Sequence, residues 1–130
     1  MNIGQAAAAS GVSAKMIRYY ESIGLVPAAP RSDGNYRVYG ERELHTLRFI
    51  RRARKLGFPL ERVGELLSLW RDGDRASADV KRIALAHVDE LEQRIRELTE
   101  MRDTLATLAA CCHGDERPDC PILQTLATNV

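Results

Sequence analysis

The chain has 130 residues, a length typical of one domain, and its 19 Lys or Arg and 18 Asp or Glu leave a net charge of +1. It has no apolar run of about eighteen residues and no secretion signal at its alanine-rich start, so we expect a cytoplasmic protein without a membrane span. Residues 1–58 hold ten Lys or Arg and only four Asp or Glu, which favours a polyanionic partner for that half.

The first segment predicts two short helices joined by a tight turn. One helix is expected over residues 4–9, Gly11 permits the turn, and Ser13 caps a second helix that ends near Ser22. Two short helices joined by a glycine-containing turn form a candidate helix-turn-helix. An ordinary helical hairpin has the same pattern and is the alternative.

A small hairpin is predicted over residues 30–40, because the sequence DGN at 33–35 is a strong tight-turn signal. Arg31 and Arg37 fall on its two arms. This arrangement is similar to a wing beside a helix-turn-helix, and a solvated surface hairpin is the alternative.

Two longer helices are predicted next, over residues 41–56 and from Pro59 to Trp70, with Gly57 between them. Apolar side chains recur in both at helical spacing, so we expect Trp70 to belong to the core. The first of the two also has five cations within eight positions, more than solubility requires: Arg48, Arg51, Arg52, Arg54 and Lys55.

An uninterrupted helix is expected from residue 77 to residue 109, about three times the average helix length. A narrow seven-residue repeat of apolar side chains runs along it and predicts packing against a partner helix. The simplest partner is a second copy of the chain, and the alternative is a helix folded back onto its own domain. The repeat consists of Val88, Leu91, Ile95, Leu98 and Leu105, and Arg102 interrupts it.

All the cysteines lie after this helix, in the segment CCHGDERPDC at 111–120, before a short terminal helix that begins at Pro121. Thiols stay reduced in the cytoplasm, which favours metal or redox chemistry over a structural disulfide. Seven residues separate Cys112 from Cys120, a spacing that lets two sulfurs face one soft ion such as Cu(I) or Zn(II). A zinc site that includes His113, a redox switch and incidental cysteines are the alternatives. A thiol enzyme is disfavoured, because no His and Asn or Asp constellation accompanies the thiols.

Over its whole length the chain resembles the MerR family of metal-responsive transcription regulators. The segments that carry the resemblance occur in the order of the family: GVSAK with IRYYESIGLV, RSDGNYRVY, RRARKLGFPLERVGELL, SADVK, MRDTL and CHGDERPDCPI. The subgroup it resembles most is that of the CueR-type copper-efflux regulators, which sense monovalent Cu, Ag and Au.

The resemblance implies a mainly α fold with three parts. Residues 1–74 would form a winged helix-turn-helix DNA-binding domain with a second helix pair. Residues 75–110 would form a dimerisation helix in an antiparallel coiled coil. Residues 111–130 would form a metal-binding loop and a short terminal helix.

The resemblance also implies a metal site. Cys112 and Cys120 match the two ligands of the monovalent sensors, which would bind one Cu(I), or Ag(I) or Au(I), per protomer. Ser77 stands where divalent sensors usually have a third cysteine, and it would lie beside the site. The chain departs from the subgroup at Cys111-Cys112-His113, where a lone cysteine is expected, so Cys111 and His113 are possible extra ligands.

For DNA, the resemblance implies a homodimer on a palindromic promoter site that RNA polymerase also occupies, and no enzymatic activity. Metal binding would distort the promoter and activate metal-efflux genes. The side chains that match the DNA-binding positions of the family are Lys15, Arg18 and Tyr19 in the recognition helix, Arg31, Tyr36 and Arg37 in the wing, and Arg52 and Arg54 in the third helix.

Three other readings of the sequence stay open. The first is a sensor of the same fold for a divalent ion such as Zn(II). The second is a thiol- or redox-responsive regulator of the same fold. The third is a metal chaperone or store without a DNA role, which the basic third helix and the predicted wing disfavour.

Overall fold

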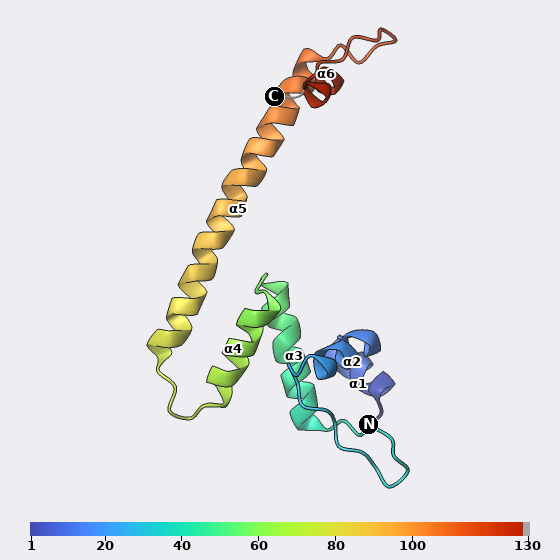
Figure 1. Cartoon of the computed structure of the whole chain (residues 1–130), viewed down its shortest axis with the longest axis vertical. Helices are drawn as coiled ribbons and strands as arrows, with labels where there is room; N and C mark the ends of the chain where they lie inside the picture. The colour runs from blue at the N-terminus through green and yellow to red at the C-terminus, as the bar shows by residue number, and fades with distance from the viewer. Residues whose placement is uncertain (129–130) are drawn as a thin grey trace. The chain divides into compact units, whose positions relative to one another are not determined.

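The computed structural model describes residues 1–128, and these are helical apart from loops and one isolated β-bridge. The helices follow one another in the order expected from the sequence, and their bounds differ from the prediction by a residue or two (Figure 1). The mainly α prediction is therefore confirmed. The helices are α1 (Ile3–Ser10), α2 (Ala14–Ser22), α3 (Glu41–Lys55), α4 (Leu60–Arg71), α5 (Ser77–Cys111) and α6 (Pro121–Ala127).

The chain divides into two compact units, Met1–Ile83 and Ala84–Val130, and the boundary between them falls inside α5. The division into three parts with boundaries after residues 74 and 110 stays a prediction. The last two residues of the predicted metal-binding part lie outside the described residues.

The helix-turn-helix begins with a reciprocal cap. Asn2 Oδ1 accepts a hydrogen bond from the Gln5 backbone N–H at 2.8 Å, and Gln5 Oε1 accepts one from the Asn2 N–H at 2.9 Å. Helix α1 ends at Gly11, which has a φ of 78°, a left-handed conformation that glycine adopts at little cost. A larger residue would also collide with a neighbour, because a Cβ at this position would lie 2.8 Å from the Arg51 side chain. Ser13 Oγ then accepts from the Met16 N–H at 3.2 Å and starts α2. The predicted glycine turn and serine cap are both present.

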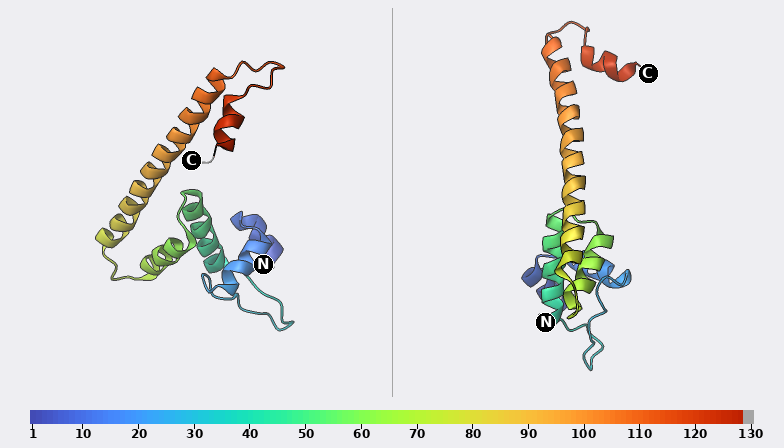
Figure 2. Two further views of the ribbon diagram at one scale, coloured as in Figure 1. Left: turned by 45° about the horizontal axis from the view of Figure 1, so that its top comes forward. Right: turned by 90° about the vertical axis from the view of Figure 1, so that its left-hand side faces the viewer.

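The core of the first unit lies where α1 packs against α2 and α3, and where α3 packs against α4. Figure 2 shows α1 and α2 gathered beside α3 in both views. The largest fully buried side chains come from α2, α3 and α4: Ile17, Leu47, Ile50, Val63 and Leu67. Burying such side chains contributes roughly 1.5–3 kcal/mol each, so this cluster holds α2 in place.

The expectation that Trp70 is a core residue was wrong. Its side chain is 44% exposed, because it stands next to the last residue of α4, where neighbouring helices cover only one face of the ring. That face stacks on Phe49, with the ring centroids 4.9 Å apart and the planes 13° from parallel. Helical spacing predicted the inward direction of this side chain correctly but not how far the core extends.

The predicted hairpin is a turn with almost no strand. Its only ladder element in the described residues is the bridge between Arg31 and Arg37. Asn35 takes a left-handed conformation with φ 64°, and the Ser32 N–H donates to the Tyr36 carbonyl at 2.7 Å. We call residues 30–40 the wing. So short a ladder gives the wing little rigidity of its own, and contacts at its base help to fix where it lies.

Helix α5 has 35 residues, which corresponds to about 52 Å. The apolar side chains of its seven-residue repeat are mostly on the surface of the chain: Val88, Ile95, Leu98 and Leu105 are each between 44% and 62% exposed. A surface repeat of this kind matches the predicted seam for a partner helix. Within residues 1–128, no helix is both long enough and apolar enough to cross a membrane.

Candidate nucleic-acid interface and thiol site

Helix α2 is amphipathic, and its exposed side carries the predicted recognition residues. Ile17 and Tyr20 are buried in the core, whereas Lys15, Arg18 and Tyr19 are exposed. Residues spaced by three and four positions share one side of a helix. The structure therefore brings the three side chains onto one surface of α2. This surface presents two cations, Lys15 and Arg18, and the aromatic ring of Tyr19.

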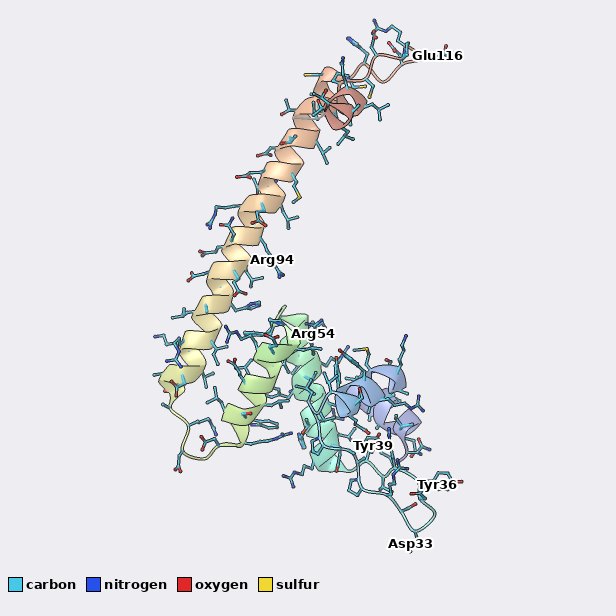
Figure 3. All side chains as sticks on the ribbon, in the orientation of Figure 1. Asp33, Tyr36, Tyr39, Arg54, Arg94 and Glu116 are labelled. Atoms are coloured by element: carbon cyan, nitrogen blue, oxygen red, sulfur yellow. The ribbon has the colours of Figure 1, made fainter. Side chains whose placement is uncertain are left out.

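The predicted DNA-binding residues of the wing differ in how exposed they are. Tyr36 is 76% exposed and lies near the tip, close to Asp33 (Figure 3). Arg31 is also exposed, and its Nη1 donates to the Asn35 carbonyl at 3.0 Å. Arg37 is half-buried at the base of the wing, with its Nη1 3.1 Å from a carboxylate oxygen of Glu21. Arg31 and Tyr36 are thus accessible to a polyanion, while Arg37 already has an anionic neighbour.

The two predicted cations of α3 do not lie together. Arg54 is exposed, and its Nη1 donates to the Phe58 carbonyl at 2.9 Å. Arg52 instead lines a hollow of about 240 Å³ between α3 and the segment from Ala8 to Gly11. Arg48 and Arg51 line the same hollow, and no carboxylate does. Sequence reasoning noted the density of cations in α3 but missed that these two join Arg52.

The structure brings Cys112 and Cys120 together. Cys112 follows the last residue of α5, Cys120 precedes the first residue of α6, and both are half-buried. Hydrogen bonds from the Leu123 backbone N–H, then from the Ile122 N–H and the Cys112 thiol, hold the pKa of Cys120 below its ordinary value of 9.0, although burial acts in the opposite direction. A thiolate at Cys120 is therefore stabilised by the start of α6 and by the second thiol.

The other candidate ligands stand apart from this pair. Cys111 is the last residue of α5 and is exposed, and His113 is exposed in the loop that follows. Over residues 1–128, no three side chains of His, Cys, Asp or Glu converge as a metal-binding group. Ser77 is exposed at the first turn of α5, at the other end of the helix from Cys111. Of the predicted ligands, the structure thus places only the two thiols of Cys112 and Cys120 together, and thiols suit a soft ion better than a hard one.

Cys120 is expected to be alkylated by iodoacetamide faster than the more exposed Cys111 at pH 7.5 in the metal-free protein. A lowered pKa means that the thiolate, the reactive form, persists to lower pH, so the difference should widen as the pH falls below 9. Peptide mapping by mass spectrometry measures both rates in one sample. Equal rates per thiol across this pH range would contradict the described environment of Cys120.

The chain matches the family described as "MerR HTH family regulatory protein" over residues 1–70 and the family described as "MerR, DNA binding" over residues 44–108. It belongs to the MerR family. It is 59% identical over 127 residues to "Heavy metal-dependent transcription regulator 2" of Rhizobium meliloti (strain 1021), which covers 98% of this chain and 86% of that protein. It is 47% identical over 127 residues to the HTH-type transcriptional regulator CueR of Escherichia coli O6:H1 (strain CFT073), with 98% and 94% covered.

Solved structures agree with the MerR assignment. The chain is similar to the transcription regulator PbrR691 from Ralstonia metallidurans CH34 in complex with lead(II), with a TM-score of 0.83, 32% identity, and 98% and 99% of the two chains covered. It is also similar to MerR from Bacillus megaterium MB1 in complex with mercury(II), with a TM-score of 0.74, 28% identity, and 98% and 100% covered. These MerR relatives are transcription regulators, which confirms the predicted family and the expectation that the chain is not an enzyme. Their names agree on no single metal ion.

Proposed function

We propose that this MerR-family regulator is a Cu(I)-responsive activator of promoters for metal-efflux genes, with Ag(I) and Au(I) as alternative effectors. It would act in the cytoplasm as a homodimer on a palindromic operator. Cys112 and Cys120 would hold one ion per protomer. The observation that carries the proposal is the pairing of these two half-buried thiols, one of them in a setting that favours the thiolate.

The number of thiolates decides between ions. Two thiolates with a monovalent ion carry one net negative charge, and a third thiolate would suit a divalent ion better. The position where the resemblance places a third cysteine in divalent sensors is Ser77, which has no thiol. Its place at the N-terminus of α5 supplies backbone N–H groups and a positive dipole end, which suit a site of negative charge.

Ser77 can approach the thiols only from a second copy of the chain. A 35-residue helix separates it from the thiols of its own chain by about 52 Å. In an antiparallel pair of α5 helices, the N-terminus of one α5 would lie near the C-terminus of the other. The proposed metal site therefore needs the dimer, and this gives the ion a means to bias how the two subunits sit on DNA.

The protein is expected to sediment as a dimer, at twice 14.5 kDa, when present at micromolar concentration. Leu98 is 62% exposed in the middle of the apolar repeat, and Leu98→Asp should shift the equilibrium to the monomer. Glu97→Asp, one position away and outside the repeat, is the control. A parent protein that stays monomeric would rule out both the antiparallel pair and the palindromic operator.

On DNA, the exposed side of α2 would enter the major groove and the wing would contact the backbone. Two copies would place two recognition helices in successive grooves. Phosphate contacts set the register, and few side chains read bases. The proposed metal response acts through DNA shape, because a dimer that bends and untwists the promoter changes how its elements are presented to RNA polymerase.

A divalent sensor is the second candidate, and one observation favours it. The similar PbrR691 structure holds lead(II), and in this chain a third thiol, Cys111, directly precedes the proposed pair. Cys111 is the exposed last residue of α5, so its recruitment would need the end of that helix to unwind. We therefore prefer the two-thiol site.

Transcription in vitro tests the proposal and its rivals together. The promoter is a fragment that the protein itself selects from a library of random duplexes, placed upstream of a reporter and supplied with RNA polymerase. Cu(I), Ag(I), Zn(II) and Pb(II) are added at buffered free concentrations. Activation by Cu(I) and Ag(I) but not by Zn(II) or Pb(II) is expected. Activation by the divalent ions alone would select the second candidate, and failure to select any duplex would favour a chaperone or store.

A further inference from the structure

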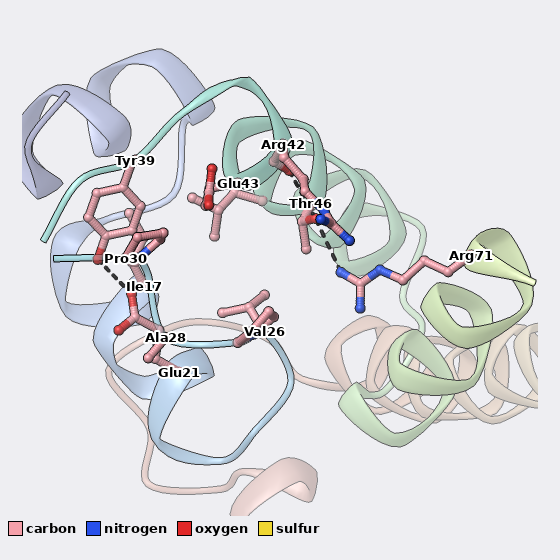
Figure 4. Close-up of a pocket in the computed structure, with 12 residues that line it drawn as sticks. Ile17, Glu21, Val26, Ala28, Pro30, Tyr39, Arg42, Glu43, Thr46 and Arg71 are labelled. Carbon is pink, nitrogen blue, oxygen red and sulfur yellow. Dashed lines mark hydrogen bonds between the residues drawn. The ribbon is translucent and has the colours of Figure 1, made fainter.

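Glu21 lies near the end of the recognition helix but does not face solvent. Its side chain is only 4% exposed, and its Oε1 accepts a hydrogen bond of 2.6 Å from the Tyr39 hydroxyl (Figure 4). Its Oε2 lies 3.1 Å from Arg37 Nη1 without the alignment of a hydrogen bond, so charge holds this second contact. Burying a carboxylate is costly unless it is paired, and both partners of this one come from the wing.

The backbone of the wing explains why these two partners converge. Side chains two positions apart on an extended segment point to the same side. Arg37 and Tyr39 therefore both face α2, whereas Tyr36 and Val38 are 76% and 41% exposed. Tyr39 is 2% exposed, so its ring is a fixed point at the base of the wing.

Tyr39 is also tied down through its backbone. Its N–H donates to the Met1 carbonyl at 2.7 Å, and its own carbonyl accepts from the Met1 amino group at 2.9 Å. Burial, followed by the hydrogen bond to Glu21, raises the pKa of the Tyr39 hydroxyl, which therefore remains a donor to the carboxylate across the physiological range. Tyr39 thus connects the wing to the start of the chain through its backbone and to α2 through its hydroxyl.

The base of the wing also borders an open space beside α2. A hollow of about 290 Å³ lies there, and Figure 4 shows Tyr39, Glu21 and Ile17 on one side of it, with Thr46 and Arg71 across from them. Of the wing, Pro30 and Tyr39 line this space, so packing is incomplete on that side of the two residues. Beside the buried ring of Tyr39 and its backbone bonds to Met1, the contacts of Glu21 are therefore the side-chain hydrogen bond and ion pair that join the wing to α2.

We propose that Glu21 is a positioning residue that sets the wing at a fixed angle to the recognition helix, so that both meet the DNA in register. The inference rests on the proposed use of α2 and the wing in DNA binding, and it is independent of the metal. Glu21 itself touches no DNA in this account. It acts through Tyr39 and Arg37.

A competing role for Glu21 makes the opposite prediction. If the carboxylate only neutralised Arg37, its removal would free a cation for phosphate and strengthen binding to all DNA. If Glu21 positions the wing, its removal should weaken operator binding even though a negative charge is lost. Glutamine lacks the charge that attracts the Arg37 guanidinium, and because one of its two terminal atoms is an amide donor, it cannot present an acceptor atom to each partner.

The test measures dissociation constants of the metal-free protein for two duplexes across a series of salt concentrations. One duplex is selected by the parent from a random library, and the other is its shuffled sequence. Glu21→Gln is expected to bind the selected duplex about tenfold more weakly and the shuffled duplex no more weakly than the parent. Tyr39→Phe should act in the same direction, and the double variant should lose less than the product of the two single losses.

Glu65→Gln is the matched control, because it removes the same charge from α4, where Glu65 pairs with Arg62 of its own helix at 3.0 Å. It should leave the preference for the selected duplex unchanged. Circular dichroism checks that each variant is folded at the assay temperature, and a change in stability alone would not alter the ratio of the two affinities. Equal or tighter binding of the selected duplex by Glu21→Gln, or equal losses on both duplexes, would overturn the proposal. A parent that selects no duplex would instead overturn the DNA-binding proposal on which this one rests.

Discussion

Serine at Cys112 or at Cys120 is expected to abolish Cu(I)-dependent transcription and to leave operator binding by the metal-free dimer unchanged. A hydroxyl is a hard, neutral donor and does not replace a thiolate for a soft monovalent ion. The two thiols flank a loop that joins α5 to α6, whereas the proposed DNA contacts come from α2, α3 and the wing. Transcription in vitro and a gel shift on the same preparation separate the two effects.

Cys111→Ser is the matched control for this pair. It changes the same chemical group one residue away, on an exposed side chain, and should respond to Cu(I) nearly as the parent does. Loss of response in Cys111→Ser would show that the additional thiol is a ligand. Loss of operator binding in Cys112→Ser or Cys120→Ser without metal would show that the loop has a structural role instead.

Arg18→Ala is expected to weaken binding to the selected operator by about 1–3 kcal/mol, that is roughly 5- to 150-fold, and to relax the preference at one base position. Arg18 is exposed on the free side of α2, where its planar guanidinium can form two hydrogen bonds to a guanine edge. Arg94→Ala, which removes the same charge from α5, should change binding little. Equal weakening on shuffled DNA would show that Arg18 contacts phosphate and not a base.

Local sequence signals predicted most of the helical elements. Ser13 and Pro121 mark helix starts, and Gly11 marks a stop, because each acts on its own turn of backbone. These effects need no knowledge of distant residues. The long α5 followed from the absence of any such break between residues 77 and 109, and the structure extends it to Cys111.

Contacts between distant segments could not be predicted in the same way. The link from Glu21 to Tyr39 joins residues eighteen positions apart, and neither sequence position signals the other. The grouping of Arg48 and Arg51 with Arg52 likewise depends on how α3 packs against the end of α1. Trp70 was misassigned for the same reason, since helical spacing gives a direction and not the extent of the neighbouring helices.

The thiol pair was predicted from spacing, but its electrostatic setting was not. The donors that stabilise a Cys120 thiolate are mainly backbone N–H groups at Leu123 and Ile122, which have no signature in side-chain identity. One signal for them was present. Pro121 indicates a helix start, and a residue just before a helix start faces unpaired N–H groups.

X-ray absorption at the copper edge of the Cu(I)-loaded dimer tests the two-thiol site most directly. The protein is loaded with one Cu(I) per protomer under reducing conditions, and the Cys111→Ser variant is measured beside the parent. Two sulfur neighbours per copper, with the same spectrum for both proteins, are the result that the site at Cys112 and Cys120 predicts. Three sulfur neighbours in the parent, or a nitrogen neighbour from His113, would contradict it.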